Sequence, residues 1–128
     1  MVIDSSALCA IVLEEADASV YVSAILNDRV RFISAATLVE ISLVAIRRRT
    51  ANAVAVLDGL LARMNIVIIP VDHEQALMAR EGFLRFGKGQ DWAGLNFGDC
   101  FSYALAKQTG QPLLFKGNDF ALTDIVQA

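Results

Sequence analysis

The chain opens with Met1-Val2-Ile3-Asp4-Ser5-Ser6-Ala7-Leu8, and this stretch indicates the class of fold. Its first three residues form an apolar run that is typical of a short strand, and Asp4 follows the run directly. Apolar residues then recur at helical spacing through Val12, and Ser5 or Ser6 can cap that helix. A strand, an acid and a helix in this order predict that Asp4 lies at the carboxyl end of the strand.

The same alternation of apolar runs and helical patterns continues to the end of the chain. It predicts strands at 30–34, 66–69 and 113–115, and helices at 18–27, 37–49, 52–64, 72–86 and 99–108. The run at 66–69 is continuously apolar, which is typical of a parallel strand buried on both faces. Strands that alternate with helices predict an α/β fold. We expect a single three-layer α/β/α domain over residues 1–128, with helices on both faces of a central parallel sheet.

Composition limits the class of protein further. The hydrophobic fraction of 55% exceeds the ordinary share of about 45–50%, so part of the apolar surface can serve a partner interface. No apolar run reaches the roughly 18 residues that cross a bilayer, so we expect no membrane span and a cytoplasmic location. Cys9 and Cys100 have no CxxC spacing, so buried thiols are expected rather than a disulfide or a zinc site. The net charge of −3 is unusual for a protein that binds nucleic acid.

Carboxylates occupy positions that indicate a shared site. Asp4 and Asp119 both follow strands, and ligands of parallel sheets bind at the carboxyl ends of the strands. Asp99 starts a helix, where a carboxylate is also a common cap. Glu40 projects from a largely apolar helical face, where an unpaired charge costs several kcal/mol. Its partner is therefore either an arginine, for which Arg47 is the nearest candidate, or a metal ion shared with the other acids.

A cluster of carboxylates without a matching basic group needs a cation. Repulsion between like charges raises their pKa values unless a divalent ion holds them ionised. Mg²⁺ or Mn²⁺ suits oxygen ligands, and Mg²⁺ needs only one or two carboxylates directly while water fills the other positions. Such a site can hydrolyse phosphodiesters, because the ion activates a water and stabilises charge on the phosphate.

Five segments of the chain resemble the successive motifs of VapC-like PIN-domain toxins. They are residues 1–8, the helix of Glu40, and the segments 87–89, 95–104 and 112–120, so the resemblance extends from end to end. It implies an Mg²⁺- or Mn²⁺-dependent endoribonuclease, the toxin of a type II toxin–antitoxin (VapBC) pair, acting on a translation-related RNA such as tRNA or rRNA. It also implies a homodimer and inhibition by a cognate VapB-like antitoxin.

The resemblance assigns roles to the acids by motif. Asp4 and Asp99 are the principal metal ligands, Glu40 helps to hold the ion or orients water, and Asp119 is the fourth member. Many relatives carry an acid two residues before the last one or directly before it, whereas this chain has Gly117 and Asn118. The acid that completes the site is therefore less firmly assigned than the other three. Three residues are expected to position the acids through hydrogen bonds without binding the metal themselves: Ser6, Asn96 and Thr123.

Basic and aromatic residues are the candidates for contact with RNA. Lys88, Lys116 and Arg85 are expected to meet phosphates, and Arg47, Arg48 and Arg49 either do the same or complement the dipole of their helix. Trp92 and Phe97 are core or interface residues by default, with base stacking as the alternative. The sole histidine, His73, is interpreted as a capping residue, and Glu14, Glu15 and Asp17 as solvated faces.

Two other classes of α/β protein with an acidic pocket would carry different motifs. A phosphoacceptor signalling domain would carry adjacent acids after the first strand, and a haloacid-dehalogenase-like phosphatase would carry Asp-x-Asp, but Ser5 and Ser6 occupy those positions. A binding module that keeps the scaffold without catalysis remains the principal alternative to the nuclease.

Overall fold

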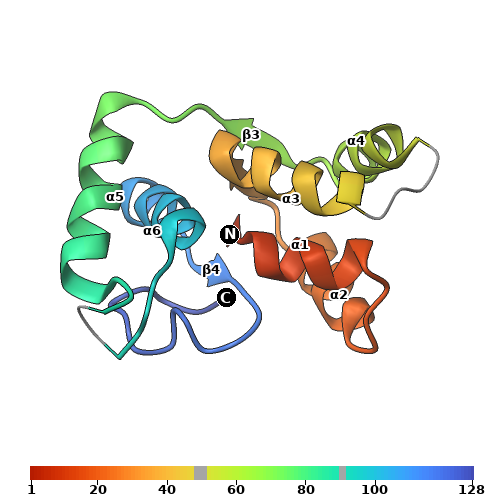
Figure 1. Ribbon diagram of the computed structural model, residues 1–128. Coiled ribbons are helices and arrows are strands. Elements are labelled where there is room, and N and C mark those ends of the chain that lie inside the picture. Colours follow the sequence, from red (N-terminus) through yellow and green to blue (C-terminus); the bar gives the residue numbers. More distant parts are fainter. Residues whose placement is uncertain (48–51, 90–91) are drawn as a thin grey trace.

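The computed structural model describes residues 1–47, 52–89 and 92–128, so Arg48, Arg49 and two residues of the polar loop lie outside the described residues. All the predicted strands and helices are present (Figure 1). Their bounds are β1 Val2–Ile3, α1 Ser5–Val12, α2 Ala18–Asn27, β2 Phe32–Ser34, α3 Ala35–Arg47, α4 Ala53–Arg63, β3 Val67–Ile69, α5 His73–Phe86, α6 Phe97–Thr109 and β4 Leu113–Leu114.

The strands form one parallel sheet in the order β3-β2-β1-β4. Val2 pairs with Leu113, which in turn bridges to Gln127, so both ends of the chain flank β4. Strand side chains alternate between two cores. Ile3 packs in the core with α1, α3 and α4, whereas Val2 packs in the core with α6. This alternation with period two produces the expected α/β/α layers, with α5 and α6 on one side of the sheet and α1 and α2 on the other (Figure 1).

The prediction for the strand at 66–69 was wrong in one respect. β3 is an edge strand, and the side chains of Val67 and Ile68 are 50% and 42% exposed. A continuous apolar run indicates that a segment is a strand but does not show how many neighbours the strand has. Successive side chains point to opposite faces, so β3 leaves apolar side chains in contact with solvent on both faces of the sheet.

A single arginine joins the ends of two helices beneath the sheet. The Arg31 guanidinium donates hydrogen bonds to the carbonyls of Leu26 and Asp28 at the end of α2, and to that of Met64 at the end of α4. These carbonyls have no partner within their helices, so the guanidinium satisfies them. No helix among residues 1–47, 52–89 and 92–128 is long and apolar enough to cross a membrane.

Candidate active site

Asp4 lies where β1 ends and α1 begins, and it is 2% exposed. Its Oδ2 accepts a capping hydrogen bond from the Ser6 amide at 2.9 Å and a second from the Ser6 hydroxyl at 2.6 Å. The Lys116 amide donates to the same hydroxyl at 3.0 Å, so the segment that follows β4 also fixes the Ser6 side chain. Oδ1 of Asp4 is buried without a hydrogen-bond partner among the described residues. One oxygen of Asp4 therefore stabilises the fold and the other is left for a ligand.

Asp99 and Asn96 form a capping box at the start of α6. The Asn96 side chain accepts from the Asp99 amide at 3.1 Å, and Oδ2 of Asp99 accepts from the Asn96 amide at 2.7 Å. Burial raises the pKa of the Asp99 carboxyl to about 7, against the opposing effect of the Asn96 amide, and the charges of Asp4, Asp119 and Glu40 raise it further. Asp99 is thus both a helix cap and a carboxyl on which three other acids act.

Glu40 reaches the same place from α3, and a glycine makes room for it. A Cβ at Gly98 would lie 2.6 Å from Oε2 of Glu40, so the carboxylate packs directly on the backbone of α6. Burial raises the pKa of Glu40, a hydrogen bond from Ser5 lowers it, and the charge of Asp4 raises it. Neither this set of causes nor any ion pair of the described residues includes the candidate partner Arg47.

Asp119 lies in the turns after β4 and is exposed, while the adjacent Phe120 is buried against Phe115. The Phe120 anchor holds this segment close enough for the charge of Asp119 to act on Asp99. The backbone turns at Gly117, two residues before Asp119, with a φ of +96° that glycine adopts without strain. Four segments distant in sequence thus bring carboxylates to the carboxyl edge of the sheet.

The donor set fits a hard divalent cation. All four groups offer oxygen, Asp4 has a buried unpartnered Oδ1, and no basic side chain of the described residues forms an ion pair with these carboxylates. Among the same residues, no three Asp, Glu, His or Cys side chains are placed to hold one ion together. Mg²⁺ agrees with the unpaired carboxylates and with the absence of a three-ligand group among these residues, because it binds one or two carboxylates directly and takes waters at its other positions.

The other predicted site residues lie in different surroundings. The Lys116 ammonium pairs with Glu15 and Asp17 and is already engaged. Arg85 pairs with Asp124 and lies over the Phe86 ring, and the Thr123 hydroxyl donates to the Phe120 carbonyl within its own turn. Arg85 and Thr123 therefore have partners other than the four acids.

Lys88, Trp92 and Phe97, the remaining candidates for contact with RNA, are all exposed. Lys88 is exposed on a short bridge in which its amide donates to the Leu95 carbonyl. Trp92 and Phe97 were expected to be core or interface residues, and the core alternative is wrong because their side chains are 93% and 79% exposed. Both aromatic rings can therefore meet a partner or a nucleobase.

Sequence reasoning missed contacts that join distant segments. Ser5 was considered only as a cap, yet it bonds Glu40, and Cys9 lies close enough to Glu40, Asp4 and Glu15 for their charges to act on it. Burial is the larger reason that the pKa of the Cys9 thiol rises to about 11. The thiol is therefore protonated at neutral pH and is no nucleophile there.

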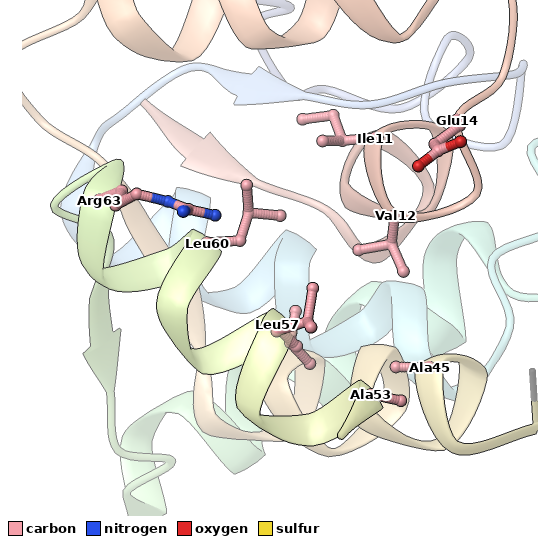
Figure 2. A pocket seen from close by; sticks show the side chains of 9 residues that line it. Ile11, Val12, Glu14, Ala45, Ala53, Leu57, Leu60 and Arg63 are labelled. Carbon is pink, nitrogen blue, oxygen red and sulfur yellow. The ribbon is translucent and has the colours of Figure 1, made fainter. Parts of the chain in front are cut away.

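Two grooves between pairs of helices offer apolar surface. The first has a volume of about 300 Å³ and runs between α1 and α4 (Figure 2), with Ile11 and Val12 facing Leu57 and Leu60, and with Glu14 and Arg63 at opposite ends. The second lies between α5 and α6 and is lined almost wholly by apolar side chains: Ala76, Ala79, Arg80, Phe83, Phe97, Cys100 and Phe101. We call them the α1–α4 groove and the α5–α6 groove.

Comparison with known proteins gives concordant results. A family model described as the PIN domain matches residues 1–126. Ribonuclease VapC of Mycolicibacterium smegmatis is 49% identical over 125 residues, covering 98% of this chain and 97% of that protein. Ribonuclease VapC30 of Mycobacterium tuberculosis is 46% identical, covering 98% and 95%. The crystal structure of M. tuberculosis VapC20, described as a sarcin-ricin loop cleaving toxin, matches with a TM-score of 0.80 and 18% identity, covering 99% of this chain and 97% of that chain.

Proposed function

Because the chain belongs to the PIN-domain family and its relatives are VapC ribonucleases, we propose that it is an Mg²⁺- or Mn²⁺-dependent endoribonuclease, the toxin of a toxin–antitoxin pair. Two observations carry the proposal: the charges of Asp4, Asp119 and Glu40 all act on the buried carboxyl of Asp99, and Oδ1 of Asp4 is buried without a hydrogen-bond partner among the described residues. Carboxylates gathered without an ion pair need a cation to stay ionised at neutral pH, and phosphodiester hydrolysis is a reaction that such a cation serves.

The residues of the site have distinct roles in this proposal. Asp4 and Asp99 hold the ion, which when bound supplies an activated water and stabilises negative charge on the scissile phosphate. Ser6 donates to Oδ2 of Asp4 and so orients Oδ1 toward the site, and Asn96 does the corresponding work for Asp99. Glu40, held between Ser5 and Gly98, orients water. Asp119 completes the set from the exposed side.

The RNA is expected to approach from the exposed edge of the site. We assign tRNA or rRNA as the substrate class and the cytoplasm as the place of action. Lys88 is the basic residue of the predicted set whose ammonium makes no ion pair among the described residues, so it is the first candidate for a phosphate contact. The exposed ring of Trp92 can stack on an unpaired base, a contact worth about 1–3 kcal/mol per base.

The α1–α4 groove is the place we assign to the antitoxin. It is apolar along its length and carries one charge of each sign at its ends, Glu14 and Arg63, as a groove for an amphipathic helix should. Val56 lines the groove and is 63% exposed, so Val56→Glu should weaken the antitoxin complex without disturbing the core. Retained affinity in this variant would move the antitoxin to another surface.

The α5–α6 groove is the surface we assign to a symmetric homodimer. An apolar patch is self-complementary across a two-fold axis because it needs no opposite charge on its partner. The ring of Phe97 stands exposed at one end of this patch, edge-on to Phe101 at 5.0 Å. Phe97→Asp should give a monomer in analytical ultracentrifugation. A wild-type protein that is monomeric at micromolar concentration would contradict the dimer.

The experiment that tests the proposed function is cleavage of total cellular RNA by purified protein. We expect discrete fragments with Mg²⁺ or Mn²⁺, none with EDTA, and none from Asp4→Asn or Asp99→Asn. Asp58→Asn is the matched control, since Asp58 is an exposed carboxylate on α4. Activity retained in both site variants would refute the assignment of the ligands.

The binding module is the second candidate. Proteins that bind the metal, carry no co-purified inhibitor and still cut no RNA would favour it. The four acids are all present, and the charges of three of them act on Asp99, which favours an enzyme over a binding module.

A further inference from the structure

Lys116 is attached to the active site through its backbone. Its amide donates to the Ser6 hydroxyl at 3.0 Å, and that hydroxyl donates to Asp4 at 2.6 Å. The main chain at Lys116 therefore cannot shift without disturbing the hydrogen bonds of a principal acid. The side chain, in contrast, can exchange one partner of its ammonium for another, because four flexible methylene groups separate the ammonium from the backbone.

The present partners of the Lys116 ammonium are two carboxylates at the turn between α1 and α2. The ammonium contacts the Glu15 carboxylate, and it lies 2.7 Å from Oδ1 of Asp17. The three side chains are 35%, 37% and 42% exposed, so solvent and ligands reach the contact. Hydrogen bonds to both acids raise the pKa of Lys116 and keep the ammonium charged.

This ion-pair cluster borders the acids of the active site. The charge of Glu15 acts on Cys9 together with the charges of Glu40 and Asp4, which places all three within electrostatic range of one thiol. An RNA phosphate that enters the site meets the repulsion of the site acids. The Lys116 ammonium, whose backbone is joined to Asp4 through Ser6, could offset this repulsion but is neutralised by its own two partners.

We propose that Glu15 and Asp17 occupy the phosphate-binding position of Lys116, and that RNA displaces them and takes the ammonium. The inference rests on the proposed ribonuclease function. Exposed ion pairs contribute little to stability, so exchanging a carboxylate for a phosphate is energetically easy. The two acids thus lower the affinity for short or weakly bound RNA while leaving the chemistry of the site unchanged.

A double-mutant cycle tests this exchange. Glu15→Gln with Asp17→Asn should lower KM for a defined oligoribonucleotide by about three- to ten-fold, with kcat unchanged, because Lys116 is released. In the Lys116→Gln background the same pair of changes should alter KM by less than about two-fold. Lys116→Arg should restore the larger effect, since arginine also binds phosphate.

Two outcomes would overturn the proposal. An equal fall in KM in both backgrounds would mean that the acids act only by general repulsion, and no fall in either would mean that they only brace the turn. Glu74→Gln with Glu81→Gln, which removes two exposed carboxylates from α5, is the matched control for net charge and should change KM little. Thermal melting of each variant verifies that the fold is retained.

Binding without cleavage supplies an independent measurement. In EDTA, fluorescence anisotropy with single-stranded RNA should show the same dependence on Lys116, and Lys116→Gln should reduce the slope of log K against log salt by about 0.7. An unchanged slope would show that the ammonium touches no phosphate. A wild-type protein that neither binds nor cuts RNA would instead refute the proposed function, and this result is distinct from a protein that cuts RNA without using Lys116.

Discussion

Asp99→Asn is the change whose effect on stability the structure specifies most closely. Without metal the pKa of Asp99 is about 7, against an ordinary value of 3.8, because the carboxyl is buried among other acids. The folded protein therefore binds more protons than the unfolded chain between these two values. Its free energy of unfolding must fall as the pH rises through this window.

The size of the fall follows from the pKa difference. About three pH units at about 1.4 kcal/mol each set an upper limit near 4 kcal/mol, and partial relaxation of the site makes about 2–4 kcal/mol the expected value. Asparagine carries no charge but keeps an oxygen that can accept from the Asn96 amide, so the cap of α6 survives. In EDTA the variant should be more stable than the wild-type protein at about pH 8, and the advantage should vanish at about pH 4.

Urea unfolding at several pH values in EDTA, repeated with Mg²⁺, measures the effect. Mg²⁺ should restore the stability of the wild-type protein at about pH 8 and leave Asp99→Asn unchanged, because the ion binds the ionised carboxylate. Asp58→Asn, on the exposed surface of α4, should follow the wild-type curve. A wild-type stability that stays level or rises between about pH 4 and pH 8 in EDTA would refute the reasoning.

Three further changes test other parts of the molecule. Gly98→Ala should push the Glu40 carboxylate aside and weaken metal binding by about ten-fold or more in calorimetry, whereas Gly59→Ala, with open space around it, should not. Arg31→Ala should cost about 2–3 kcal/mol in urea unfolding because three helix-end carbonyls lose their donor, with the exposed Arg29→Ala as control. Cys9 should react with a maleimide more slowly than a free thiol at about pH 8, since its pKa is about 11, and a normal rate would contradict its burial.

The sequence was sufficient for the order and type of all the strands and helices. Periodicity carries this information, because each strand and helix shows one apolar face to a core. The helix at 18–27 has the bounds that were predicted for it. The position of β3 at the sheet edge could not be predicted, because an apolar run reports on side chains and not on the neighbours of the strand.

The site was predictable where topology alone determines it. Asp4 and Asp119 follow strands of a parallel sheet, so their common edge followed from the fold class, and Glu40 was conspicuous as a charge on an apolar face. The partners of Lys116 were not predictable, because Glu15 and Asp17 lie 101 and 99 residues away and nothing local relates them. The ligand roles of the acids stay predictions until metal binding is measured.

The double use of Asp4 and Asp99 has a consequence for how this scaffold can change over evolutionary time. Asp4 is the N-cap of α1, and Asp99 accepts from the amide of Asn96, the N-cap of α6, so mutational drift that removes either acid also weakens a helix start, by about 1 kcal/mol for the N-cap. A descendant that abandons catalysis but keeps the scaffold for another purpose is therefore expected to carry asparagine or serine at these positions rather than alanine. Such replacements in a genome would mark retired nucleases that still fold.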